Sequence, residues 1–202
     1  MAITGKGALR RAALLAAACE LLQEVGFDQI SHRTVATRAG LPLAATTYYF
    51  ATLDILLAAA TQELRSRHLR AGREIVDATG AGLCPPDRLA EVVIAILVGD
   101  LVDPPPARVS ALYERFLQAG RRPAVRPVVR DWNTGLVDLL ADLLHRVGYP
   151  PPPDGARTLL ALADGILLSE LAEGGDTALD QARRRLAVAL PTVTGTPVGR
   201  PG

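Results

Sequence analysis

The chain has 202 residues, enough for one medium domain or for two small ones that share a helix. Hydrophobic residues make up 49% of it but aromatic residues only 4%, so the core must be aliphatic, and its Ala and Leu favour helices over sheets. Cys19 and Cys84 lie far apart in sequence with no His beside them, which argues against a disulfide framework or a zinc site. We therefore expect an all-α protein with no metal and no cofactor.

The formal net charge of +1 conceals an uneven distribution of charge along the chain. The residues through Arg73 carry a balance of +4 and the remainder carries −3. A basic N-terminal part suits a nucleic-acid contact, although an excess of this size is also ordinary scatter. The N-terminus lacks the apolar core of a signal peptide, and no apolar run reaches the roughly 20 residues that span a bilayer. We expect a cytoplasmic protein without a membrane contact.

The first predicted helix ends at about Val25, where Gly26 stops it. Residues 1–7 before it are typical of a short flexible arm. The basic side chains of this region, Lys6, Arg10 and Arg11, either lie along DNA phosphates or are simply solvated. One stripe of the helix is apolar and consists of Leu14, Ala18, Leu21, Leu22 and Val25. This stripe predicts a helix that packs on the core of an N-terminal head.

The stretch from residue 31 to residue 50 predicts a helix, a tight turn and a second helix. The Ser31 hydroxyl can cap the first of these helices, Gly40 can take the left-handed conformation that ends it, and Pro42 fits the first turn of the second. The second helix has no charged residue and reads Leu43, Ala44, Ala45, Thr46, Thr47, Tyr48 and Tyr49. Hydroxyls and apolar groups on such a helix can read base edges in the major groove while phosphates are held from elsewhere.

The run from Arg11 to Leu57 resembles the DNA-binding head of the TetR (tetracycline repressor) family of bacterial regulators. The matching residues are Arg11, Leu14, Leu15, Ala18, Leu21 and Leu22, then Gly26 and Phe27, then Val35, Ala36, Ala39, Gly40 and Leu41, and finally Tyr48 to Phe50 with Thr52, Asp54, Leu56 and Leu57. The resemblance implies a homodimer whose two recognition helices lie about 34 Å apart and read a palindromic operator in double-stranded DNA.

Position by position, the resemblance also implies a set of DNA-binding residues. The set comprises Ser31, His32, Arg33, Leu43, Ala44, Thr47, Tyr48, Tyr49 and Thr52. Arg33 reaches a guanine, holds a phosphate or pairs with Asp28, and His32 either contacts a phosphate or is a solvated cap residue. Tyr48 is the better candidate for DNA contact, whereas the ring of Tyr49 either reaches DNA or packs on the head.

A long helix follows the motif and continues to about Thr79. Thr52 is a suitable N-cap, and Asp54 places a negative charge where the helix dipole favours it. At 1.5 Å per residue this helix is a rod of about 40 Å, which would act as a lever on the head. We place the DNA-binding domain at residues 8–60, with its motif at 31–50, and a regulatory and dimerisation domain at 61–190.

The apolar pattern predicts five further helices in the regulatory domain. They cover about residues 88–102, 109–120, 125–147, 156–171 and 176–190, and the first of them is apolar nearly all round, as a buried helix is. Residues 148–153 form a stiff proline-rich connector. Residues 191–202, rich in Pro, Gly and Thr, are predicted to be a disordered tail.

The helix at 156–171 carries more apolar surface than one chain readily covers, and its small residues permit close helix approach. We expect this helix and the helix at 125–147 to pair with their copies in a second subunit as a four-helix bundle; the family resemblance implies dimerisation through the last two major helices. Tyr113, Phe116, Trp132 and Asn133, with Glu114, either line a ligand cavity or belong to the core. The resemblance implies such a cavity, in which an unidentified small-molecule effector would shift the dimer between its DNA-binding and non-binding forms.

Two other classes of protein compete with a regulator. A helical enzyme would need a catalytic arrangement, but the three histidines lie on separate predicted helices, and there is no phosphate-binding loop and no paired metal-ligand His. A dimeric adaptor that binds only protein would not retain DNA at low salt. The sequence favours a ligand-responsive DNA-binding transcriptional regulator, most simply a repressor that occludes a promoter.

Overall fold

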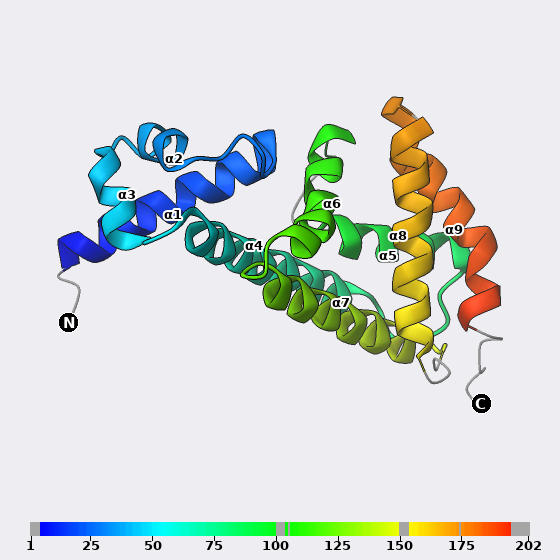
Figure 1. Cartoon of the computed structure of the whole chain (residues 1–202). Coiled ribbons are helices and arrows are strands. Elements are labelled where there is room, and N and C mark those ends of the chain that lie inside the picture. Colours follow the sequence, from blue (N-terminus) through cyan, green and yellow to red (C-terminus); the bar gives the residue numbers. More distant parts are fainter. Residues whose placement is uncertain (1–4, 100–103, 105, 150–153, 174, 195–202) are drawn as a thin grey trace. The chain divides into compact units, whose positions relative to one another are not determined.

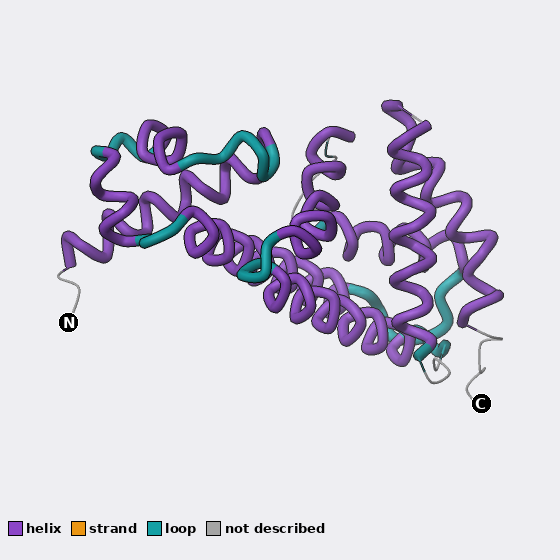
Figure 2. The backbone as a smooth tube through the Cα atoms, in the orientation of Figure 1, coloured by secondary structure: helices purple, strands orange, loops and turns teal. Residues whose placement is uncertain are grey.

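The computed structural model describes residues 5–99, 104, 106–149, 154–173 and 175–194. Over these residues the regular structure consists of nine α-helices and one 3-10 turn, with no strand (Figures 1 and 2). The all-α prediction is confirmed. Within the same residues, no single helix is long and apolar enough to cross a membrane; α3 (Leu43–Tyr49) and α4 (Leu53–Ala78) meet that criterion only as a pair bent by 77°.

The chain divides into two compact units. The first comprises Met1–Ser66 and Ala107–Asp131, and the second comprises Arg67–Pro106 and Trp132–Gly202. Two helices, α4 (Leu53–Ala78) and α7 (Arg126–Arg146), pass from one unit into the other. The first unit thus takes in residues 107–131, which the sequence-based division assigns to the regulatory part. The functional domains predicted at 8–60 and 61–190 stay a prediction.

The first unit is built around α1 (Gly5–Val25), against which α2 (His32–Arg38) and α3 (Leu43–Tyr49) pack (Figure 1). The predicted arm is wrong at its C-terminal end, because Gly5 to Gly7 already belong to α1, while residues 1–4 lie outside the described part. The predicted apolar stripe of α1 lies in the core except for Val25, which is exposed. The largest buried members of this core are Leu14, Leu22, Phe27, Ile30, Phe50, Leu56 and Leu57.

Local capping fixes the motif between residues 31 and 50. Ser31 Oγ accepts a hydrogen bond from the Thr34 amide, and Thr34 Oγ1 accepts one from the Ser31 amide. The two residues thus form a reciprocal capping box. Gly40 takes a φ of +63°, a left-handed conformation that ends α2. Pro42 is the N-cap of α3 rather than its first helical residue. The turn is therefore set by residues within one short stretch, as the sequence predicts.

Helix α6 (Pro106–Arg121) packs on the head inside the first unit. Glu114 Oε2 accepts a hydrogen bond from the Phe27 amide at 3.0 Å, so this carboxylate closes the turn after α1 instead of lining a cavity. Gln118 Nε2 donates to Asp28 Oδ1 at 3.2 Å. The sequence could not indicate these contacts, because the partners are 87 and 90 residues apart.

The second unit is a bundle in which α9 (Ala178–Thr194) packs against α5 (Pro86–Val98) and α8 (Gly155–Glu173), with the 3-10 turn Gly175–Thr177 between α8 and α9. Eight residues of α5 are buried, which confirms it as the enclosed helix. Helix α9 continues through Pro191 to Thr194, so the predicted tail is wrong for its first four residues. The rest of that tail lies outside the described residues, as do the prolines of the predicted connector.

Inside the second unit, α7 packs closely on α4. A Cβ placed on Gly72 would lie 2.7 Å from Leu139, and one on Gly135 would lie 2.6 Å from Leu69, so both glycines are needed for the helices to approach. The large apolar residues of α7, such as Leu139 and Leu143, are consequently buried within their own chain. These side chains of α7 thus already belong to the core of their own chain, and the predicted pairing of the helices at 125–147 and 156–171 with a second subunit stays a prediction.

Candidate nucleic-acid interface

Helix α3 exposes nearly all of its length. Only Thr46 is buried, and its hydroxyl donates to the Leu43 carbonyl at 2.7 Å, which satisfies it within the helix. Tyr48 is 71% exposed, and its ring meets that of Tyr49 edge to face with 4.9 Å between centroids. Tyr49 in turn is half-buried against the head core. Tyr49 thus supports Tyr48 in a projecting position, while Leu43, Ala44 and Thr47 are exposed beside it.

The other predicted DNA-binding residues lie at the start of α2 and just before α4. Two of them cap a helix: the Ser31 hydroxyl belongs to the capping box of α2, and Thr52 Oγ1 accepts a hydrogen bond from the Ile55 amide at 3.2 Å. Ser31 is half-buried and Thr52 is exposed. Arg33 is exposed and does not pair with Asp28, which is bonded to Gln118. His32 Nδ1 is buried and has no hydrogen-bond partner among the described residues. Arg33 therefore keeps its charged group available for a ligand, whereas His32 Nδ1, although unpaired, is buried.

All four carboxylates between Gly5 and Ala60 are engaged by groups outside α3. Glu20 and Glu24 both accept from Arg38, with Arg38 Nη2 to Glu24 Oε2 at 2.7 Å. Asp28 accepts from Gln118, and Asp54 Oδ1 accepts from Arg122 at 2.6 Å. The exposed face of α3 carries no carboxylate, and of the neighbouring acids Glu20, Glu24 and Asp54 are paired with arginines, which weakens the repulsion that a polyanion would meet.

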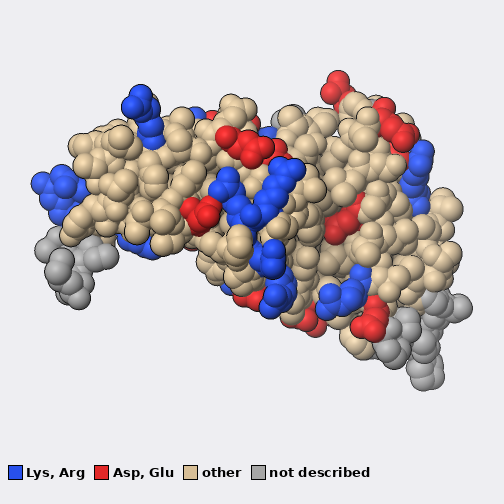
Figure 3. Space-filling view, viewed as in Figure 1, with Lys and Arg blue, Asp and Glu red and all other residues tan. Residues whose placement is uncertain are grey.

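Three cations of the head remain uncompensated. Lys6, Arg10 and Arg33 form no side-chain hydrogen bond or ion pair with any described residue. By contrast, Arg38 is tied to its two glutamates, and the Arg11 guanidinium lies over the Phe50 ring at 5.1 Å. On the face in Figure 3, basic side chains project at the start of α1 and over α2 with no acidic group directly beside them. Of these three cations, the predicted DNA-binding set contains Arg33 but neither Lys6 nor Arg10.

The residues predicted to bind an effector divide between the two units. Tyr113 and Phe116 are in the first unit, where their rings stack at 5.9 Å. Trp132 and Asn133 are in the second unit, where the Trp132 ring meets that of His68 at 5.3 Å and His68 Nε2 is 2.8 Å from the Ile96 carbonyl oxygen. Trp132 is only 2% exposed, and Asn133 Oδ1 is buried with no hydrogen bond to the described residues.

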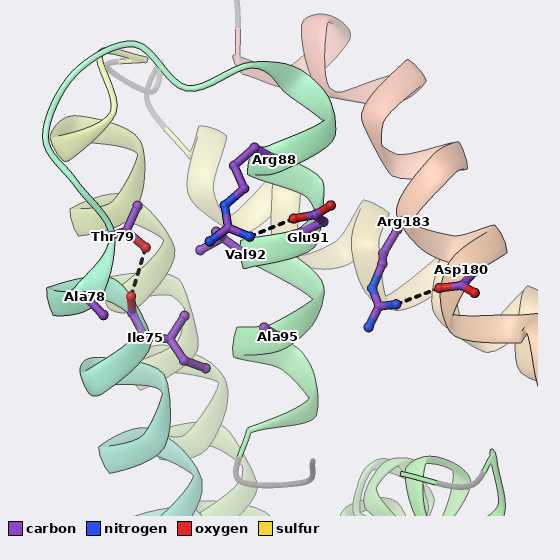
Figure 4. A pocket seen from close by; sticks show the side chains of 9 residues that line it. All are labelled: Ile75, Ala78, Thr79, Arg88, Glu91, Val92, Ala95, Asp180 and Arg183. Carbon is purple, nitrogen blue, oxygen red and sulfur yellow. Dashed lines mark hydrogen bonds and ion pairs between the residues drawn. The ribbon is translucent and has the colours of Figure 1, made fainter. Parts of the chain in front are cut away.

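A cleft of about 490 Å³ lies among the end of α4, α5 and α9 (Figure 4). Its charged groups are paired within their own helices, Arg88 with Glu91 at 2.7 Å and Arg183 with Asp180 at 2.7 Å. The Thr79 hydroxyl donates to the Ile75 carbonyl. The cleft therefore offers a ligand no uncompensated charge, and we do not regard it as the functional site.

Comparison with known proteins assigns the chain to a family. A family model described as the tetracyclin repressor-like C-terminal domain matches residues 85–192, more than half of the chain. The chain belongs to the TetR family. The predicted resemblance, which rested on the N-terminal head, is thus confirmed by an independent match to the C-terminal part.

Solved structures of TetR-family proteins match nearly the whole chain. The multidrug-binding protein EbrR in complex with proflavin is 35% identical, with 89% of this chain and 98% of EbrR covered and a TM-score of 0.64. A TetR-family member from Streptomyces coelicolor A3, SCO1917, is 36% identical over 89% of this chain and 96% of its own, with a TM-score of 0.61. A transcriptional regulator from Streptomyces coelicolor A3(2), SCO7518, is 26% identical over 93% and 99%, with a TM-score of 0.68. A comparison with curated protein sequences found no match.

The protein is a TetR-like transcriptional regulator. Members of the TetR family are transcriptional regulators and not enzymes, so the enzyme alternative is set aside. The helix-turn-helix and DNA binding follow from membership of this family.

Proposed function

We propose that this TetR-family regulator is a homodimeric repressor that binds a palindromic operator and is released from it by a small-molecule effector. In this proposal the DNA-binding residues are Ser31, His32, Arg33, Leu43, Ala44, Thr47, Tyr48, Tyr49 and Thr52. The observation that carries it is the exposed, carboxylate-free face of α3 with the uncompensated Arg33 beside it. Occlusion of the promoter by the bound dimer is the simplest route to repression.

A salt titration of DNA binding tests this proposal. The probe is the intergenic DNA that flanks the gene, and the readout is a band shift over a range of salt concentrations. Binding should weaken steeply with salt, because each phosphate contact releases counterions.

The exchanges Arg33→Ala and Tyr48→Ala should each weaken binding by about 1–3 kcal/mol if the side chain reads a base. The exposed Arg70, far from the motif in sequence, provides the matched control R70A. Binding that is absent, or indifferent to salt, would refute the proposal.

The dimer is proposed to form through α8 and α9. Within one chain, α8 exposes a stripe of small and apolar side chains at helical spacing, namely Ala161, Gly165, Leu168 and Ala172. Val188 of α9 is 82% exposed and Leu168 is 44% exposed. A Cβ built on Gly165 would meet no atom within 4 Å, so this glycine serves no contact inside the described chain. Small residues at such positions allow two helix pairs to approach closely.

The effector is proposed to be an aromatic cation. EbrR has been solved in complex with proflavin, ethidium and malachite green. Proflavin and ethidium carry amino groups that donate hydrogen bonds and flat rings that stack on aromatic side chains. In this chain the buried Asn133 Oδ1 is an acceptor in need of a donor, and it follows Trp132 in sequence. We propose that Trp132 and Asn133, both in the second unit, contact the effector, while the predicted ligand contacts of Tyr113 and Phe116, in the first unit, stay a prediction.

Fluorescence provides the test of the effector class, because Trp132 is the single tryptophan. Ethidium or proflavin should quench Trp132 and release the duplex in the same concentration range. The exchange Asn133→Leu should weaken binding of these dyes about tenfold or more, since it removes the acceptor but keeps the volume. Leu117→Ala, at an exposed position of α6, is the control. Dyes that release DNA without changing Trp132 emission would contradict this assignment.

A further inference from the structure

We propose that a hollow between α5 and α9, in the second unit, binds an α-amino acid with an aliphatic side chain. The ammonium group of this ligand meets Asp87, its carboxylate meets Arg184, and its side chain enters the cleft of Figure 4. The hollow shares no described lining residue with the DNA-binding face or with Trp132 and Asn133. It is therefore an additional site, and it does not depend on the function proposed above.

The hollow has a volume of about 220 Å³ and lies between two helices that pack against each other. Among the described residues, α5 contributes Asp87 and Glu91 to its lining, and α9 contributes Asp180, Arg183 and Arg184. Asp87 lies one turn before Glu91, and Arg184 lies one turn after Asp180, since residues four positions apart share a face of a helix. Acidic and basic groups thus reach one hollow from two helices.

Asp87 and Arg184 are the two unpaired charges of this lining. The other acids of the lining are paired with arginines of their own helices, each at 2.7 Å (Figure 4). The side chains of Asp87 and Arg184 are exposed and form no hydrogen bond or ion pair with any described residue, and they do not pair with each other across the hollow. One carboxylate and one guanidinium therefore remain available to a ligand.

A ligand that carries both charges suits this arrangement better than a simple ion does. An anion drawn to Arg184 would also meet the carboxylates of the lining, and a cation drawn to Asp87 would also meet its arginines, so like charges oppose either ion. An α-amino acid carries an ammonium and a carboxylate at neutral pH, so it can satisfy both free groups at once. The guanidinium can hold the carboxylate through two parallel hydrogen bonds.

The size of the hollow and its apolar extension define the rest of the ligand. At about 30 Å³ per water molecule, the hollow has room for about seven waters, close to the size of a small amino acid. The cleft of about 490 Å³ shares Glu91, Asp180 and Arg183 with the hollow, so the two are continuous. The apolar lining of the cleft consists of Ile75, Ala78, Val92 and Ala95 (Figure 4). A branched aliphatic side chain can cover these residues, whereas glycine cannot.

Saturation-transfer NMR on the full-length protein tests the site with L-leucine as the probe. Because exposed ion pairs are individually weak, the expected Kd is about 1 mM. N-acetyl-leucine lacks the ammonium charge and leucinamide lacks the carboxylate, so each should bind about fivefold more weakly than leucine. Glycine, which lacks the side chain, should also bind about fivefold more weakly or worse.

Two exchanges match each charged group of the ligand with its partner in the protein. Asp87→Asn should weaken leucine binding about fivefold but leave N-acetyl-leucine binding unchanged, because that ligand already lacks the ammonium group. Arg184→Gln should weaken leucine binding by a similar factor but leave leucinamide binding unchanged. Arg157→Gln, at an exposed and unpaired position of α8 in the same unit, is the control and should match the wild type. Circular dichroism checks that each variant is folded.

Three results would overturn the proposal. The first is no saturation transfer to leucine at about ten times the expected Kd. The second is equal binding of leucine, N-acetyl-leucine and leucinamide, which would mean that the cleft takes apolar groups without reading their charge. The third is D87N or R184Q weakening all three ligands alike, since that would place the effect in the structure of the protein and not in a contact with the ligand. None of these measurements involves DNA, so failure here and failure of the proposed DNA binding are distinguishable.

Discussion

At Gly26, two separate constraints act on one residue. Its φ of +71° is a left-handed conformation that costs an L-residue about 1 kcal/mol or more. A Cβ at this position would also lie 2.6 Å from Glu114 Oε1 and still closer to Oε2. The first constraint comes from the local turn after α1, and the second comes from α6, far along the chain. Gly26 is therefore needed both for the turn after α1 and for the close approach of Glu114 from α6.

Comparison of two glycines separates these constraints. Gly40 has a similar φ of +63°, but a Cβ on it would meet nothing within 4 Å. Gly40→Ala should therefore cost only the backbone term of about 1 kcal/mol, whereas Gly26→Ala should cost about 2–4 kcal/mol in the free energy of unfolding. Urea unfolding followed by circular dichroism measures both. Equal losses of unfolding free energy in the two variants would mean that the Glu114 carboxylate moves aside without destabilising the protein.

At the scale of elements, α1 and α2 are tied together by Arg38. Its guanidinium reaches Glu24 through both terminal nitrogens, at 3.0 and 2.7 Å, and Glu20 at 3.4 Å. The hydrogen bond from Arg38, reinforced by its charge, lowers the pKa of Glu24 below its ordinary value of 4.5. The hydrogen bonds to Glu24 and Glu20 raise the pKa of Arg38, which stays charged at every pH of interest.

The lowered pKa of Glu24 predicts an acid-sensitive contribution to stability. The ionised carboxylate stabilises the folded state above pH 4.5, and this contribution is lost as the pH falls through the lower pKa of the folded state. Thermal unfolding of wild type and Glu24→Gln should thus show a gap in Tm near neutral pH that closes as the solution is acidified below pH 4.5. Glu173→Gln, at an exposed position, should show no such gap. A gap that widens in acid would contradict the assignment.

Among the contacts of helix α6 with the head is a part-buried hydrogen bond from the Phe27 amide to Glu114. Phe27 is 4% exposed, so its amide depends on Glu114 for an acceptor. Glu114→Ala should cost about 1–3 kcal/mol of stability because it leaves this N–H unpaired, whereas Glu114→Gln retains an acceptor oxygen and should cost less.

A double-mutant cycle in urea checks this contact. Gly26→Ala combined with Glu114→Ala should be less destabilised than the sum of the two single exchanges, since removal of the carboxylate gives the new Cβ room. Strict additivity would show that Gly26 and Glu114 are not coupled.

At the scale of the whole molecule, the proposed function depends on the pairing of two heads. One α3 helix spans only a few base pairs, so tight and selective binding requires a second copy held at a fixed spacing. The exposed stripe on α8 and the exposed Val188 of α9 are the surfaces proposed to provide that pairing. Their exposure in a single chain is unusual for a contiguous apolar set, and such patches mark interaction surfaces.

Charges introduced into this surface should separate the subunits. We expect Leu168→Glu combined with Val188→Glu to give a monomer in analytical ultracentrifugation and to lose at least a hundredfold in operator affinity. The control is Leu83→Glu, at an equally apolar position that is 65% exposed and lies outside α8 and α9. A dimeric double variant would show that pairing uses another surface.

Several features were predictable because their causes lie within a few residues of one another. The Ser31 cap, the left-handed Gly40 and the uncharged run of α3 define the helix-turn-helix locally, and the buried α5 follows from its apolar composition. The contacts of Glu114 and Asp28 were not predictable for the opposite reason. Their partners, Phe27 and Gln118, are distant in sequence, and no periodicity records such a pairing.

The sequence by itself determined an all-helical chain with a TetR-type head, since capping, turn chemistry and apolar spacing act over one or two helical turns. Only the tertiary structure decided which arginines are available to DNA. Arg10, Arg11 and Arg38 are alike in the sequence, yet Arg11 lies over Phe50 and Arg38 is held by Glu24, while Arg10 keeps its charge uncompensated beside Tyr48. The physical reason is that a charge is defined by its neighbours in space, and folding chooses those neighbours from the whole chain.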